Sequence, residues 1–140
     1  MKTKKQRRRV TPFTLIEVVV VIVILVMLAG IATPLYMKNI KKSRIGTAQT
    51  QIRLLEDALQ SYKLDVGHYP SSLDCLMENV DQEEKWEGPY MKKVPKDPWG
   101  YEYQYLPDGD HNQGEFDLCS FGADGQEGGE DENADLNNWD

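Results

Sequence analysis

The chain has 140 residues and a formal net charge of −7, which is unevenly distributed. The first twelve residues carry +6 and residues 13–140 carry −13, and from Asp108 onward there are eleven acidic residues and no Lys or Arg. So acidic an end repels phosphate, which argues against nucleic acid as a ligand and suits cation binding or simple solvation.

The two cysteines, Cys75 and Cys119, belong to no CxxC or Cys/His cluster, which excludes zinc and thiol-redox motifs. They are expected either to form a disulfide or to remain two separate buried thiols. The sequence leaves both alternatives open.

A long apolar stretch near the start is predicted to form a membrane-spanning helix. Residues 13–32 carry one charge, Glu17, and as a helix they would be about 30 Å long, close to the hydrocarbon thickness of a bilayer. The basic residues before them keep the start of the chain on the cytoplasmic side. We therefore divide the chain into a basic leader (1–12), a hydrophobic transmembrane and assembly helix (13–34), an amphipathic helix (35–66) and a remainder (67–140).

Two simpler interpretations of this stretch compete with an assembly role. It could be a plain signal anchor, or a secretory signal cut after Ala32, because Gly30-Ile31-Ala32 has the small-x-small pattern of a cleavage site. Neither explains Glu17, since a lone carboxylate in an apolar helix costs about 3 kcal/mol or more in lipid. Glu17 is therefore predicted to be functional and to have a cationic partner.

The helix is predicted to continue past Pro34, which should kink or loosen it, and to end near Gly67, a residue suited to the C-terminal cap. Its second half has one apolar stripe with helical spacing, which should pack on a small sheet. The stripe consists of Ile45, Ala48, Ile52, Leu55, Leu59 and Tyr62.

Residues 67–140 are predicted to form, with the second half of the helix, an α+β domain with little regular structure. A short helix capped by Ser71 or Ser72 is expected over Leu73–Met77. Residues Tyr101–Leu106 alternate as a strand does, and a second strand over Phe116–Phe121 should pair with it in an antiparallel hairpin. The Gly- and acid-rich segment from Gly122 onward should be flexible unless something holds it.

The run PFTLIEVVVVIVIL resembles the N-terminal signature of type IV pilins and type II secretion pseudopilins. The resemblance implies that a prepilin peptidase cuts before Phe13, which becomes a methylated N-terminus, and that Glu17 attracts the terminal amine of a neighbouring subunit. Pro34 matches a proline of the family's helix. Pro12 stands where the family has Gly; because Pro fixes φ and lacks an N–H, it could obstruct cleavage.

Three further segments resemble the major pseudopilins of type II secretion: LEDALQSYKLDVGHYPSSLDCL, GPYMKKVPKDPWGYEYQYL and the terminal FGADGQEGG with ADLNNW. The resemblance implies a pilin-like fold and a structural subunit of a periplasmic filament, anchored in the inner membrane before assembly. Implied partners are further copies, minor pseudopilins, the prepilin peptidase and the inner-membrane assembly platform. A type IV pilin and an anchored or secreted small domain are the alternatives. No catalytic constellation is present, so an enzyme is not expected.

The acidic terminal loop is predicted to hold one calcium ion, which prefers oxygen ligands. An EF-hand is excluded: a loop begun at Asp108 would have Gln113 at its sixth position and Cys119 at its twelfth. Composition alone favours a solvated tail, but the resemblance implies a single calcium site. Its expected ligands are the carboxylates of Asp124, Asp135 and Asp131 and the carbonyls of Phe121 and Gln126.

Overall fold

The computed structural model describes residues 12–139, and it divides into two compact units, residues 1–38 and residues 39–140. One helix, α1 (Leu15–Val66), contributes to both. The expected leader (1–12) lies outside the described residues except for Pro12. The other elements are η1 (Leu73–Leu76), β1 (Gln104–Leu106), β2 (Asp117–Ser120), η2 (Asp131–Asn133) and β3 (Leu136–Asn137).

The first unit consists of the apolar part of α1, and every described side chain in it is exposed. The helix begins at Leu15 rather than Phe13 because Thr14 is its N-cap: the Thr14 hydroxyl oxygen accepts the N–H of Glu17 at 3.4 Å, and the Thr14 carbonyl accepts the N–H of Val18 at 3.3 Å. Pro34 lies inside the helix, as predicted. Among the described residues, α1 is the helix long and apolar enough to span a membrane.

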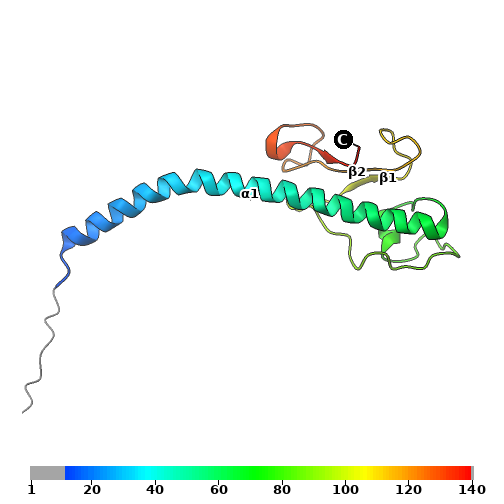
Figure 1. The fold of residues 1–140 in the computed structure, drawn as a ribbon, viewed down its shortest axis with the longest axis horizontal. Helices are drawn as coiled ribbons and strands as arrows, with labels where there is room; N and C mark the ends of the chain where they lie inside the picture. The colour runs from blue at the N-terminus through cyan, green and yellow to red at the C-terminus, as the bar shows by residue number, and fades with distance from the viewer. Residues whose placement is uncertain (1–11, 140) are drawn as a thin grey trace, which may run out of the picture. The chain divides into compact units, whose positions relative to one another are not determined.

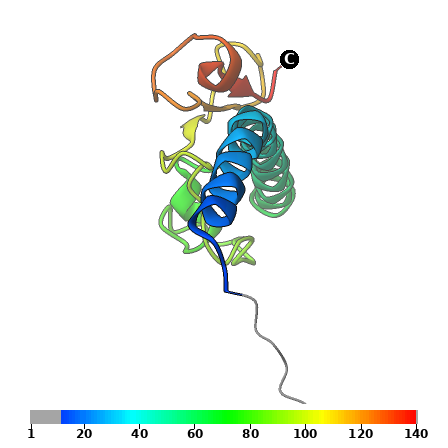
Figure 2. The same cartoon turned by 90° about the vertical axis from the view of Figure 1, so that its left-hand side faces the viewer.

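The second unit packs a small sheet on residues 39–66 of α1 (Figure 1). The strand order is β1-β2-β3 and both pairings are antiparallel, with Tyr105 opposite Leu118 and Ser120 opposite Leu136. The predicted hairpin is thus confirmed, but β1 is shorter than expected because only Gln104–Leu106 pairs with β2, and residues 101–103 are irregular. Strand β3 was not predicted. Figure 2 shows the C-terminal segment on one side of this unit and the η1 region on the other.

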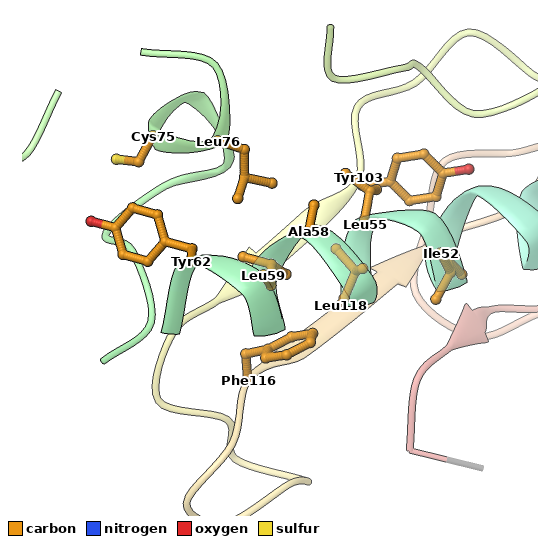
Figure 3. Packing of buried hydrophobic residues seen from close by; sticks show 10 residues of the cluster. All are labelled: Ile52, Leu55, Ala58, Leu59, Tyr62, Cys75, Leu76, Tyr103, Phe116 and Leu118. Atoms are coloured by element: carbon orange, nitrogen blue, oxygen red, sulfur yellow. The ribbon is translucent and has the colours of Figure 1, made fainter. Parts of the chain in front are cut away.

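The core lies where the apolar stripe of α1 meets β2 and η1 (Figure 3). Leu55, Leu59 and Tyr62 are fully buried, and Phe116 and Leu118 contact the same cluster from β2 and the residue before it. Each buried Leu stabilises such a core by about 1.5–3 kcal/mol. The predicted stripe is confirmed, apart from Ile45, which is only partly buried.

Two local predictions on α1 and η1 have different outcomes. The helix ends at Val66, and Gly67 adopts φ 102° while its N–H donates to the Lys63 carbonyl, so the predicted glycine cap is confirmed. The short helix is a 3₁₀ turn, and the hydroxyl of its N-cap residue, Ser72, makes no capping hydrogen bond. Instead that hydroxyl lies 3.6 Å from the Cys75 sulfur, so the predicted serine cap is wrong.

Candidate functional site

Three of the residues predicted for leader cleavage and assembly, Pro12, Phe13 and Glu17, lie at or just before the start of α1. Pro12 and Phe13 precede the helix, and the Phe13 side chain is 77 % exposed. Glu17 lies in the first turn, where its carboxylate also interacts favourably with the positive end of the helix dipole. Among the described residues, no ion pair involves Glu17.

Pro34 leaves the Gly30 carbonyl of α1 without its usual N–H donor, because proline has none. The preceding hydroxyl, that of Thr33, donates to the Ala29 carbonyl at 2.8 Å. The helix passes through this point without interruption.

The C-terminal loop is ordered by its own backbone and does not form a loose tail. Gly122 adopts φ 64°, and an added Cβ there would come within 2.7 Å of the Glu132 carbonyl oxygen. That oxygen accepts the N–H of Ala123 at 2.9 Å, and the N–H of Gly128 donates to the Asp135 carboxylate at 2.9 Å. Positive φ angles at the glycines therefore allow the loop to fold back on η2.

The expected calcium ligands are spread over this loop. The Asp124 carboxylate accepts the N–H of Gln126 at 3.1 Å, Asp131 begins η2 with φ 55°, and Phe121 directly follows β2. Within residues 12–139, no group of three or more His, Cys, Asp and Glu side chains is arranged to hold a metal ion.

One carboxylate oxygen in the loop is suited to bind a cation. Asp135 Oδ1 is buried and has no hydrogen-bond partner among the described residues. Because a buried carboxylate oxygen without a donor is costly, a bound cation would remove that penalty. The residues present therefore fit a calcium ion at Asp135.

Glu132 joins the C-terminal loop to two distant parts of the chain. Its Oε1 accepts the indole N–H of Trp99 at 3.0 Å and a guanidinium N–H of Arg44 at 3.3 Å, and its Oε2 lies 3.5 Å from the Lys41 ammonium. The Trp99 hydrogen bond, followed by the two cations, lowers the pKa of Glu132. We call Glu132, Trp99, Lys41 and Arg44 the Glu132 latch.

Asp97 organises the turn that positions Trp99. Its Oδ1 accepts the N–H groups of Trp99 at 3.1 Å and Tyr101 at 2.8 Å, and its Oδ2 accepts the Ser120 hydroxyl at 2.6 Å. Gly100 completes the turn with φ 98°. The motif Asp97-Pro98-Trp99-Gly100 is therefore a side-chain-stabilised turn that joins β2 to the Glu132 latch.

The loop between β1 and β2 is organised by Asp117. Its Oδ1 accepts the Asn112 N–H, while its Oδ2 accepts the His111 N–H and lies 3.0 Å from His111 Nδ1. Burial raises the pKa of Asp117, but these donors outweigh it and the net shift is downward. The His111 ring in turn stacks on Trp139, with centroids 4.3 Å apart.

Both cysteines are free, buried thiols, which settles the open alternative. Burial raises the pKa of Cys119 to about 11, so this thiol is protonated and unreactive near neutral pH.

The sequence did not reveal Glu132, Asp97 or Asp117 as organising residues. Glu132 looks like any other acid in an acidic tail, because its partners lie far away in the chain. For Asp97 a signal existed: Asp before Pro and two residues before Trp-Gly is typical of an Asx-type turn.

Comparison with known proteins gives consistent results. Residues 35–139 match the family model described as "Type II secretion system (T2SS), protein G". The chain is 46 % identical over 141 residues to type II secretion system core protein G of Vibrio cholerae, covering 96 % of this chain and 95 % of that one. It is 44 % identical over 142 residues to the Pseudomonas aeruginosa protein of the same name, covering 96 % and 99 %.

A solved structure is similar as well. It is the crystal structure of the major pseudopilin from the type 2 secretion system of enterohaemorrhagic Escherichia coli, with a TM-score of 0.60 and 32 % identity. The match covers 74 % of this chain and 92 % of that one.

Proposed function

This chain belongs to the type II secretion system protein G family and is a structural subunit of a pseudopilus, and we propose that its assembly depends on Phe13 and Glu17. The observation that carries the proposal is the wholly exposed apolar start of α1, whose one carboxylate lies in the first turn. Such a surface is stable only in lipid or against other helices, and the carboxylate requires a cation there. The N-terminal amine of a neighbouring Phe13 supplies one.

The proposed route begins in the inner membrane. The prepilin peptidase cuts after Pro12, Phe13 becomes the N-terminus and is methylated, and residues 39–140 lie in the periplasm. An inner-membrane platform then adds subunits to a filament that also contains minor pseudopilins. Because Pro34 removes one backbone hydrogen bond from the helix, α1 can bend at this point as it leaves lipid and packs in the filament. In this role the chain is structural and carries out no chemistry.

The first test measures the N-terminus of the protein from its native membranes by intact mass and sequencing. A methylated Phe13 start supports the route, and a Met1 start contradicts it. Pro12→Gly is the matched variant: if it alone gives the Phe13 start, the native leader is not a substrate.

The second test concerns Glu17. Glu17→Gln removes the charge but keeps the shape of the side chain. We expect filament yield, counted by electron microscopy of sheared cells, to fall about tenfold or more, because the N-terminal amine of the neighbouring Phe13 would then be buried without a counter-charge. Glu84→Gln, an exposed acid elsewhere, is the control and should leave the yield unchanged. Normal filaments from Glu17→Gln would contradict the proposed role of this residue.

We also propose that the C-terminal loop binds one calcium ion. Asp135 Oδ1, which lacks a donor, and Asp124 would supply carboxylates, Phe121 and Gln126 carbonyls, and Asp131 is a further candidate. The ion would supply the positive charge that the loop lacks and hold the loop closed next to the Glu132 latch.

Asp135→Asn tests the calcium proposal. At a calcium concentration about 100-fold above the dissociation constant, binding stabilises the wild-type chain by about 2.7 kcal/mol, and the variant should lose most of this gain. Thermal unfolding with calcium, with magnesium and with chelator measures it, and Asp57→Asn is the control. An equal calcium shift in wild type and Asp135→Asn would remove Asp135 from the site.

A further inference from the structure

A cluster of basic residues follows the apolar part of α1. Residues 38–44 contain four cations and no acid, and the whole stretch between Glu17 and Glu56 lacks Asp and Glu. This local excess of positive charge lies in a chain whose residues 13–140 carry −13. The three cations that belong to the second unit form what we call the basic cluster: Lys41, Lys42 and Arg44.

The basic cluster lies close to the segment expected in lipid. Leu35, Tyr36 and Met37 extend the exposed apolar surface of α1 beyond Pro34, and an α-helix rises about 6 Å from Met37 to Lys41. The headgroup layer on each side of a bilayer is about 5–8 Å thick. Because side chains on a helix tilt toward its N-terminus, the long Lys and Arg side chains reach back toward this layer. The charged groups of the basic cluster are thus expected near the lipid phosphates.

Positive charge at this place favours an anionic partner. Lys and Arg beside a membrane span favour the side that is not translocated, so the cluster opposes insertion of the helix and the six cations of the leader must outweigh it. Once the helix is inserted, the same charges attract anionic headgroups within about 8–10 Å, the screening length at physiological salt. The charge that hinders insertion therefore gains a partner at the membrane surface.

The basic cluster is accessible and only weakly paired. The Lys41 side chain is 52 % exposed and that of Arg44 is 48 % exposed, and they pair with Glu132 at 3.5 Å and 3.3 Å. Exposed ion pairs of this kind contribute little to stability, so another anion can replace Glu132. Lys42 is exposed, and no ion pair between described residues includes it. Three cations therefore share one carboxylate, which leaves positive charge for a second anion.

The phosphate of a phospholipid has the chemistry to complete this cluster. A guanidinium donates two parallel N–H groups to a phosphate, and an ammonium adds a compact charge with three donors. Free phosphate offers the same oxygens, but the apolar part of α1 keeps lipid phosphates next to the cluster at high effective concentration. A lipid headgroup is therefore the occupant that the chain itself favours.

We propose that the basic cluster binds the phosphate of an anionic phospholipid at the periplasmic face of the inner membrane, and that Glu132 competes with this headgroup for Lys41 and Arg44. The headgroup holds the subunit in the membrane before assembly, and closure of the Glu132 latch weakens this hold as the subunit leaves. The inference rests on the proposed function, since it requires α1 to span the membrane with the second unit in the periplasm.

A short pulse of an amine-acylating reagent, applied to the full chain in lipid nanodiscs, tests the contact. The discs contain phosphatidylcholine alone or mixed with phosphatidylglycerol, and peptide mass spectrometry gives the acylation rate of each lysine. We expect Lys41 and Lys42 to react about threefold or more slowly with phosphatidylglycerol present, because an ammonium bound to phosphate is less available. Lys85, which is exposed elsewhere in the second unit, is the internal control and should react equally in both membranes. Equal rates for the basic cluster in the two membranes, or an equal slowing of Lys85, overturn the inference.

Inorganic phosphate distinguishes a lipid from a free anion. Added at about 10 mM to discs of phosphatidylcholine, it should leave Lys41 and Lys42 unprotected, because nothing holds it at the cluster. Protection equal to that given by phosphatidylglycerol would overturn the assignment of a lipid.

Glu132→Gln tests the competition. The measured quantity is the Lys41 acylation rate in phosphatidylcholine divided by the rate with phosphatidylglycerol present. This ratio should rise about twofold or more in the variant, because the headgroup has lost its competitor. Glu130→Gln is the matched control: it changes a nearby exposed acid that makes no ion pair between described residues, and it should keep the wild-type ratio. A wild-type ratio in Glu132→Gln overturns the inference.

Carbonate extraction of the full chain from phosphatidylcholine vesicles shows separately whether α1 is inserted. A chain that resists extraction but gains no protection from phosphatidylglycerol overturns the inference and leaves the proposed function standing. A chain that carbonate removes from the vesicles contradicts both.

Discussion

Replacing Asp97 should strongly destabilise the second unit. Asp97 is only 5 % exposed, and it accepts three hydrogen bonds. In Asp97→Ala the hydroxyl of Ser120, which is fully buried, loses its acceptor at a cost of about 1–3 kcal/mol. The N–H groups of Trp99 and Tyr101 are nearer to water, so each should add about 0.5–1 kcal/mol.

The expected loss is therefore about 2–5 kcal/mol, or roughly 8–40 °C in melting temperature for a unit of this size. Asp97→Asn keeps one oxygen for the two N–H groups but cannot accept from Ser120, so it should lose about 1–2 kcal/mol.

Urea unfolding of the detergent-solubilised chain, followed by tryptophan fluorescence, measures these changes. All three tryptophans, Trp86, Trp99 and Trp139, lie in the second unit, so the signal reports on that unit alone. Asp57→Ala is the control: it removes an exposed acid of α1 and should change the free energy of unfolding by less than about 0.5 kcal/mol. A loss below about 1 kcal/mol for Asp97→Ala would refute the reasoning.

Three other predictions concern single contacts. Glu132→Gln should lower the urea midpoint at low salt, and the difference from wild type should shrink in about 1 M NaCl, because it removes two ion pairs to α1 that salt screens. Gly122→Ala should cost about 1–3 kcal/mol in urea unfolding, since φ is 64° and the new Cβ meets the Glu132 carbonyl; an unchanged midpoint would show that the loop can relax. The Tyr69 carbonyl, and then Glu83, raise the pKa of His68 above its usual 6.5. Its contribution is thus complete below about pH 6.5 and is lost as the pH rises through the folded-state value, so the stability difference between wild type and His68→Gln should be larger at about pH 6 than at about pH 9.

Much of the fold could be predicted because its signals are local. The apolar stripe of α1 follows from helical spacing and its end from Gly67, while the hairpin follows from the alternating run Tyr101–Leu106 and a second short run, Phe116–Phe121, after a turn-rich connection. Strand β3 could not be predicted, since Leu136–Asn137 is too short to show a pattern. It forms because the side chain of Asn138 binds the N–H of Leu118 at 2.8 Å while its backbone N–H binds the Leu118 carbonyl.

The candidate site, like the fold, could be predicted from the sequence only in part. The segment around Phe13 and Glu17 could be recognised because one charge in an apolar run is conspicuous in any sequence. The calcium ligands were inferred from resemblance and stay a prediction. The aromatic stack of His111 on Trp139 could not be anticipated, because it depends on a fold that brings the chain's last residues back to the β1–β2 loop.

During synthesis, the contacts of the Glu132 latch can form only after almost the whole second unit has been made. Arg44 and Glu132 are separated by 88 residues, and ribosomes add about 5–20 residues per second. The helix half that carries Leu55 and Leu59 therefore exists for several seconds before Phe116, Leu118 and finally Glu132 have been made. For that interval the apolar stripe has no sheet to cover it, and early protection by a chaperone would act on this half of α1 rather than on the sheet.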